Sequence, residues 1–152
     1  MTEHGLDLSD DFTGRPGTAF VVGGSGGLGA AVVRELAARG SDVAFTYRQN
    51  EASAAQLAQT VSDLGRQAWT IGLDLRNHDG CAQAIDAIAE AAGGIHTLVY
   101  AAGPHVPQKH LSKVTPAEMQ EQLDADASGF FAVASPALPR LRQTEGSIVA
   151  VT

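Results

Sequence analysis

The stretch VVGGSGGLGAAVVRELAARG, residues 21–40, decides the fold, because it leads from an apolar run through a glycine-rich loop directly into a helical pattern. Five of its first nine residues are glycine, which marks unusual backbone dihedrals or a close backbone approach. Leu28, Val32 and Leu36 then recur at helical spacing, and Gly40 ends the pattern. The loop is therefore either a tight turn without a ligand or a cradle for a phosphate group.

The glycines of this loop fit two phosphate-binding frames. Gly24, Gly26 and Gly29 fit G-x-G-x-x-G, whereas Gly23, Gly27 and Gly29 fit G-x-x-x-G-x-G. Either frame sets backbone N–H groups and the positive end of a helix dipole against a pyrophosphate. The position of the loop after a strand and before a helix favours this interpretation, and a ligand-free glycine turn is the alternative.

Strand-like apolar runs alternate with helical patterns along the whole chain. The expected strands are residues 18–23, 42–47, 68–73, 95–101 and 147–152. The expected helices are residues 27–39, 51–64 and 80–92, and a long one that begins at the capping box Thr115–Glu118 and runs to about residue 141, with a kink at Pro136. Helical spacing also predicts the buried faces of the second and third helices, which are Ala54, Leu57, Val61 and Leu64 in one and Cys81, Ile85, Ile88 and Ala92 in the other. This alternation predicts an α/β fold with a parallel sheet covered on both faces. Such sheets bind ligands beyond the carboxyl ends of their strands.

Composition limits the classes of function. The chain has 152 residues, of which 44% are hydrophobic, and its formal net charge is -7. This balance favours one globular domain and argues against nucleic acid or an anionic membrane as the main partner. The single Cys81 excludes an intrachain disulfide and a cysteine-rich metal site, and we expect no metal. The polar start and the lack of a membrane-length apolar run predict a cytoplasmic protein.

The residues that follow the second and third strands suggest the cofactor. The second strand ends at Tyr47 and is followed by Arg48, with no acid that could bond the ribose 2′-hydroxyl of NAD. Arg48 would attract a 2′-phosphate, which favours NADP, and a solvated surface arginine is the alternative. Asp74 follows the third strand, where it could accept a hydrogen bond from the adenine amino group. A turn or helix-capping aspartate is the other interpretation.

Small residues follow the fourth strand. Ala101, Ala102 and Gly103 would let a flat, bulky ligand lie against the backbone, although tight packing between strand and helix would also require them. His105 and His110 lie in the loop beyond. No acid partner is evident for either of them, and we interpret both as solvated loop residues.

Four segments in order, VVGGSGGLG, DLRN, LVYAAG and DADASGFF, resemble the N-terminal half of the short-chain dehydrogenases/reductases. The similarity is strongest to 3-oxoacyl-[acyl-carrier-protein] reductases, and it covers nearly the whole chain after about Gly14. It implies a doubly wound Rossmann domain with strand order 3-2-1-4-5, here ending after strand five. It also implies NADP(H)-dependent hydride transfer to or from a carbonyl or alcohol, with 3-oxoacyl thioesters as candidate substrates and NAD(H) as the less favoured cofactor.

The resemblance also implies site residues and domain limits. Residues 1–14 would form an N-terminal extension and residues 15–152 the NADP-binding domain. The glycine frame with Gly23 is selected, and the expected cofactor contacts are Gly23, Ser25, Gly27, Leu28, Gly29, Arg48, Asp74, Leu75, Ala101, Ala102 and Gly103. The resemblance also points to a homo-oligomer that pairs through the long helix and the helix after it, of which this sequence contains only the first, so the oligomeric state stays open.

Four positions depart from the family pattern. Val22 replaces the usual threonine of the glycine loop, and Tyr100 and Ala101 replace the two asparagines of the Asn-Asn-Ala-Gly motif. Asp126 stands at the position of the catalytic asparagine, whose main-chain carbonyl holds a water in the family's proton relay. Asp126 could keep that geometry while it adds a negative charge.

The family's remaining catalytic residues are not in this sequence. A serine just after the fifth strand and a Tyr-x-x-x-Lys motif on the next helix would fall beyond Thr152, and neither Tyr47 nor Tyr100 is followed by lysine four residues later. The sequence therefore predicts a fragment of a longer enzyme, inactive by itself. The alternative is a non-catalytic dinucleotide-binding module.

Overall fold

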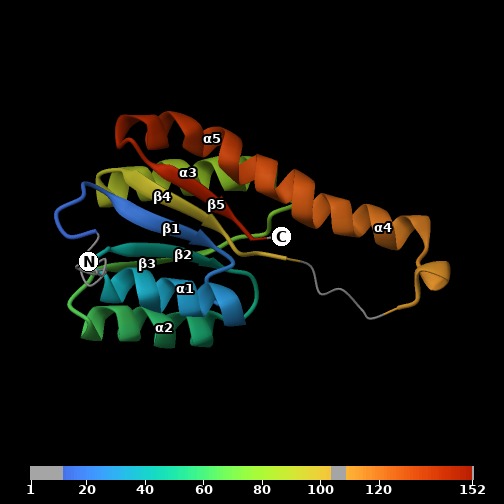
Figure 1. Cartoon of the computed structure of the whole chain (residues 1–152), viewed down its shortest axis with the longest axis horizontal. Coiled ribbons are helices and arrows are strands. Elements are labelled where there is room, and N and C mark those ends of the chain that lie inside the picture. Colours follow the sequence, from blue (N-terminus) through green and yellow to red (C-terminus); the bar gives the residue numbers. More distant parts are fainter. Residues whose placement is uncertain (1–11, 104–108, 152) are drawn as a thin grey trace, which may run out of the picture.

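The computed structural model describes residues 12–103 and 109–151 and contains one five-stranded sheet (Figure 1). The strands lie in the order β3-β2-β1-β4-β5, and every neighbouring pair is parallel. This confirms the predicted fold class and strand order. The strands are β1 (Thr18–Val22), β2 (Val43–Tyr47), β3 (Ala68–Gly72), β4 (Ile95–Tyr100) and β5 (Ser147–Ala150).

Helices cover both faces of this sheet. In Figure 1, α1 and α2 pack below the strands, α3 and α5 pack above them, and α4 extends past the end of the sheet. The helices are α1 (Gly27–Ala38), α2 (Glu51–Asp63), α3 (His78–Ala92), α4 (Pro116–Leu123) and α5 (Gly129–Gln143). Among the described residues, no helix is both long enough and apolar enough to cross a membrane.

Alternate residues of the central strands feed two separate cores. Phe20 and Val22 of β1 face α3 and α5, where Ile85 belongs to the same buried cluster. Val21 faces the opposite side and packs with Val33 of α1 and other residues of α1 and α2. Every residue of β1 and β4 is buried. Burial on both faces explains why these strands are continuous apolar runs.

The buried face of α1 differs by one position from the predicted stripe of Leu28, Val32 and Leu36. The buried residues are Gly29, Val33 and Ala37, while Leu28 is 55% exposed. A Cβ on Gly29 would lie 2.2 Å from the carbonyl oxygen of Gly23. Gly29 must therefore face the loop, and this contact fixes which side of the helix turns toward the sheet.

The predicted faces of the other two helices agree better with the structure. Ala54, Leu57 and Val61 of α2 are buried as predicted, but Leu64 follows the end of the helix and is 47% exposed. In α3, the stripe that begins at Cys81 is buried through two further turns. The predicted stripe was therefore wrong at the end of α2, where the helical repeat no longer fixes the direction of the side chain.

The predicted long helix is divided in two by a π-helical turn. The capping box is confirmed, since Thr115 accepts a hydrogen bond from the backbone N–H of Glu118 and the Glu118 carboxylate accepts one from the N–H of Thr115. The π-turn spans Asp124–Ser128, between α4 and α5. It lies well before Pro136, the residue at which the sequence suggested a kink.

Candidate functional site

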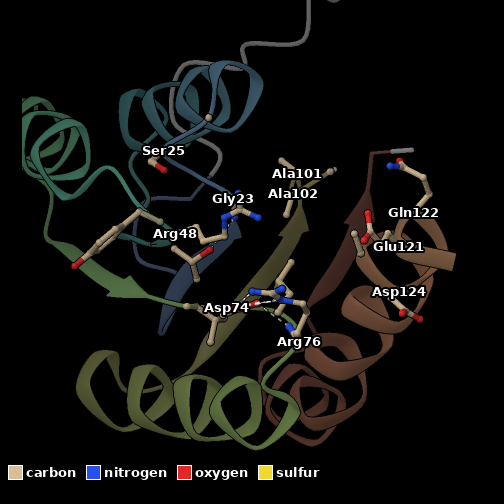
Figure 2. Close-up of a pocket in the computed structure, with 17 residues that line it drawn as sticks. Gly23, Ser25, Arg48, Asp74, Arg76, Ala101, Ala102, Glu121, Gln122 and Asp124 are labelled. Carbon is tan, nitrogen blue, oxygen red and sulfur yellow. Dashed lines mark hydrogen bonds and ion pairs between the residues drawn. The ribbon is translucent and has the colours of Figure 1, made fainter. Parts of the chain in front are cut away.

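A pocket of about 660 Å³ opens at the carboxyl ends of β1 to β4 (Figure 2). Its walls come from the glycine loop, from the residues that follow β2, β3 and β4, and from the last turn of α4 with the start of the π-turn. Eight of the eleven predicted cofactor contacts line it: Gly23, Ser25, Arg48, Asp74, Leu75, Ala101, Ala102 and Gly103. Sequence reasoning had indicated this end of the sheet.

The glycine loop is held tightly against the neighbouring strands. Gly23 has a φ of 79°, and a Cβ on it would lie 2.7 Å from the backbone of Ala102. The N–H of Gly23 donates a 2.8 Å hydrogen bond to the hydroxyl of Thr46 in β2. A Cβ on Gly24 would lie 2.4 Å from the Cβ of Phe45. Packing within the protein therefore explains why these two positions are glycine.

Gly27 is different, because no contact within the described part of the protein requires glycine at this position. A Cβ on this residue would meet nothing within 4 Å, although glycine weakens a helix by roughly 1 kcal/mol relative to alanine. Gly27 begins α1, whose N-cap residue Gly26 has no capping side chain, and the first turn carries no acidic residue. The positive end of the helix dipole is thus open to an anion from outside. Gly27, Leu28 and Gly29 do not line the pocket itself.

Arg48 projects from the end of β2 into the pocket (Figure 2). In the part of the chain that the structure describes, its guanidinium makes no hydrogen bond or ion pair. The neighbouring polar residue, Asn50, caps α2 by accepting a hydrogen bond from the N–H of Ser53. The end of β2 therefore presents one uncommitted cation to the pocket.

Asp74 pairs with Arg76, a residue that sequence reasoning did not select. Nε of Arg76 lies 3.0 and 3.2 Å from the two carboxylate oxygens, and Nη2 lies 2.5 Å from Oδ2. These side-chain hydrogen bonds lower the pKa of Asp74 to about 2. A hydrogen bond from the backbone N–H of Arg76 and the charge of Arg48 act in the same direction. Asp74 is a turn residue as well as a pocket residue, and the cap of α3 is Asn77 instead.

The residues after β4 are consistent with both interpretations of the sequence, which were tight packing and space for a flat ligand. The N–H of Ala101 donates to the carbonyl of Val22 at 2.9 Å, and the Ala102 backbone lies close against Gly23. Tight packing therefore requires small residues here. Both alanines and Gly103 also line the pocket, and a Cβ on Gly103 would meet no atom within 4 Å.

Tyr100, the last residue of β4, is buried and bonded to the π-turn. Its hydroxyl donates a 2.7 Å hydrogen bond to the carbonyl oxygen of Ala125, and its ring meets Phe130 edge-on at 5.4 Å. Burial, and secondarily the negative charge of Asp126, raises the pKa of Tyr100 to about 12. Asp126 is exposed and does not line the pocket.

Several pocket residues were not predicted. Arg76 lies in the quoted segment DLRN, so its two-residue spacing from Asp74 was an available signal. Glu121 and Asp124 form an acidic wall of the pocket. No local signal in the sequence marks these two residues, because the position of α4 brings them to the pocket. The additional lining residues are Gly26, Thr46, Tyr47, Leu73, Arg76, Glu121, Gln122, Asp124 and Ala125.

Two histidines, His105 and His110, follow β4 in the sequence. His105 lies outside the described residues. His110 bonds to Ser112 at the start of a short 3₁₀ helix, Leu111–Lys113, and does not line the pocket. Over residues 12–103 and 109–151, no group of three or more His, Cys, Asp or Glu is arranged to hold a metal ion.

Known proteins share both the sequence pattern and the fold. A family model described as short chain dehydrogenase matches residues 17–152. The chain is 30% identical over 127 residues to the 3-dehydrosphinganine reductase TSC10B of Arabidopsis thaliana, covering 84% of this chain and 37% of that protein. It is 30% identical over 135 residues to the acetoacetyl-CoA reductase of Paracoccus denitrificans, covering 88% of this chain and 53% of that one.

A solved structure has a similar fold. The short chain dehydrogenase from Burkholderia cenocepacia J2315, in complex with NADP, superimposes with a TM-score of 0.81 at 31% identity and covers 90% of this chain. This chain covers 55% of that structure. It thus spans about half the length, or less, of these relatives.

Proposed function

The chain belongs to the short-chain dehydrogenase family, and we propose that it is the dinucleotide-binding part of an NADP(H)-dependent oxidoreductase. One observation carries the choice of cofactor: Arg48 is an uncommitted cation at the end of β2, where no carboxylate is available to a ribose 2′-hydroxyl. A charge-assisted bond to phosphate is stronger than a neutral one, so the phosphorylated dinucleotide is favoured.

The residues of the pocket and the adjoining N-terminus of α1 fit the parts of such a cofactor. The open end of α1 at Gly27 and the N–H groups of the loop suit a pyrophosphate. Arg48 suits a 2′-phosphate on the adenosine ribose, with Asp74 and Leu75 beside the adenine. The small side chains of Ala101 and Ala102 leave room for a flat ring at the end of β4.

The bound cofactor would supply the hydride that moves between the nicotinamide and a carbonyl or alcohol carbon. The protein must supply a proton donor as well. Tyr100 is unsuited to this task near neutral pH, because its hydroxyl is bonded to Ala125 and its pKa is about 12. We therefore propose that the proton donor is not among these 152 residues, and that these residues alone catalyse no turnover.

Substrate and assembly are proposals by similarity. The relative named acetoacetyl-CoA reductase supports a 3-oxoacyl thioester as the substrate class. The 70% exposed ring of Phe131 and the 42% exposed side chain of Leu138 on α5 support a homo-oligomer that pairs through this helix. A cytoplasmic location stays a prediction.

A non-catalytic dinucleotide-binding module is the second candidate. One feature of the sequence favours it: neither tyrosine is followed by lysine four residues later, so the Tyr-x-x-x-Lys motif of the family's enzymes does not occur in these residues. Both candidates predict dinucleotide binding, and only the enzyme predicts turnover by a protein that contains the family's Ser and Tyr-x-x-x-Lys residues.

Calorimetric titration of the purified chain with NADP and NAD tests the cofactor. NADP should bind more tightly than NAD, and Arg48→Ala should lower the ratio of NADP to NAD affinity by roughly ten- to a hundredfold. Arg34→Ala is the matched control, since Arg34 is an exposed arginine of α1 outside the pocket. Equal or tighter binding of NAD by the unmutated, folded chain would refute the choice of NADP.

A further inference from the structure

Acidic side chains outnumber basic side chains around the pocket. Three acids line it, Asp74, Glu121 and Asp124, against two cations, Arg48 and Arg76. A ribose phosphate adds close to two further negative charges at neutral pH. Such a ligand is repelled from this end of the sheet unless the acid closest to Arg48 is neutralised.

Arg76 is placed to neutralise that acid. Its side chain bonds both oxygens of the Asp74 carboxylate at 2.5–3.2 Å, and its backbone N–H adds a third donor at 3.1 Å. The N–H of Asn77 bonds the carbonyl of Asp74 at 2.9 Å and fixes the turn. Asp74, with a pKa of about 2, is charged throughout the physiological range, so a cation has to cancel its charge.

Arg48 lies within electrostatic reach of the same carboxylate, because its charge also lowers the pKa of Asp74. Figure 2 shows the Arg76 guanidinium against Asp74, with Arg48 extending into the pocket from the end of β2. Since Arg76 already occupies both carboxylate oxygens, Arg48 keeps its own donors free. Arg48 is the second cation whose charge acts on Asp74, so it would be drawn to this carboxylate without Arg76.

We propose that Arg76 is a specificity-determining residue, which neutralises Asp74 and thereby keeps Arg48 available for a phosphorylated ribose. This inference rests on the proposed function and extends it to a residue that need not touch the phosphate. An unphosphorylated ribose carries no charge and gains little from Arg76. Removal of Arg76 therefore weakens binding of NADP far more than binding of NAD.

A double-mutant cycle tests this role. The affinities of NADP and NAD are measured by calorimetric titration for the wild-type chain, Arg76→Gln, Asp74→Asn and the double variant. Arg76→Gln should lower the ratio of NADP to NAD affinity by about tenfold, because a whole charge is left uncancelled beside a near-dianion. The double variant should restore the wild-type ratio to within about threefold, since no charge then needs neutralising.

Matched controls separate the possible outcomes. Arg140→Gln breaks a comparable exposed ion pair, at 3.0 Å from Asp86, outside the pocket, and should leave the ratio unchanged. An unchanged ratio in Arg76→Gln overturns the inference. A loss that persists in the double variant also overturns it, because Arg76 would then bind the phosphate directly. If the folded wild-type chain binds neither dinucleotide, the proposed function fails first and this inference fails with it.

Discussion

The hydroxyl of Tyr100 donates a 2.7 Å hydrogen bond to the carbonyl oxygen of Ala125, and so joins the end of β4 to the π-turn between α4 and α5. A π-turn shifts the backbone hydrogen bonds of a helix by one residue. A Cβ on Gly129 would lie 2.8 Å from this hydroxyl, so the approach depends on a glycine. Ala125 and Asp124 of the same turn line the pocket. The tyrosine therefore holds one wall of the site to the sheet.

Loss of this hydrogen bond should be measurable as a change in stability. Tyr100→Phe keeps the edge-on contact with Phe130 but leaves the Ala125 carbonyl without the hydroxyl donor. We expect the free energy of unfolding to fall by about 1–2 kcal/mol, as measured by urea denaturation. Tyr47→Phe is the control, because no described partner bonds that hydroxyl. Equal effects of the two substitutions would show that the bond to Ala125 does not hold the turn.

Gly27 should be dispensable for folding and necessary for binding. A Cβ at this position meets no protein atom within 4 Å, so Gly27→Val should change the free energy of unfolding by less than about 1 kcal/mol. The same side chain would occupy the space in front of the α1 N-terminus and should weaken NADP binding at least about tenfold. Thermal unfolding and calorimetric titration measure the two effects.

Gly29→Ala is the comparison variant, because it should lower the stability that Gly27→Val leaves nearly unchanged. Its Cβ would lie 2.2 Å from the carbonyl oxygen of Gly23, so the loop must shift and the chain should lose stability. If the folded Gly27→Val variant binds NADP with unchanged affinity, the loop is a structural turn and the phosphate interpretation is wrong.

Buried His96 should make stability depend on pH. Its ring lies near the hydroxyls of Ser41, at 3.2 Å, and Thr97, at 2.9 Å, and stacks on Phe12. Burial, and secondarily the charge of Arg15, lowers its pKa from 6.5 to about 4. The unfolded chain therefore binds the proton more readily than the folded chain. The stabilisation is fully present above pH 6.5 and is lost as the pH falls toward 4.

Urea denaturation across this pH range measures the effect. The free energy of unfolding should fall by about 2–3 kcal/mol between pH 6.5 and pH 4 from His96 alone. His96→Gln should flatten this part of the profile, while His110→Gln, which changes an exposed histidine, should leave it unchanged. A profile of the same slope in His96→Gln would assign the dependence to other groups.

The 152-residue chain should not reduce carbonyl compounds. The pKa of Tyr100 is about 12 and its proton is engaged by Ala125, so it cannot serve as the acid near neutral pH. NADPH consumption with a panel of 3-oxoacyl thioesters and simple ketones provides the measurement. Robust turnover by the pure chain would refute this, because Tyr100, His105 or Asp126 would then have to act in place of the family's Tyr-x-x-x-Lys tyrosine.

Patterns that depend on neighbours in the sequence were sufficient for much of the fold. Each predicted strand and helix begins and ends within two residues of the observed one, apart from the break in the long helix. The capping box at Thr115 and Glu118 was also predictable, because both partners lie within one helical turn. The glycines of the loop between β1 and α1 also stand out in the sequence, since their spacing reflects backbone constraints within a single strand–loop–helix unit.

Contacts that the hydrophobic repeat does not encode decided the rest. The face of α1 follows from the approach of Gly29 to Gly23, and the acidic wall from the bond between Tyr100 and Ala125, so neither was visible in the hydrophobic repeat. Arg76 is close to Asp74 in sequence, yet its long side chain could equally have extended into water, because exposed ion pairs differ little in free energy from solvated charges. The sequence by itself therefore determined the elements and their order, whereas only the tertiary structure decided which side chains meet at the pocket.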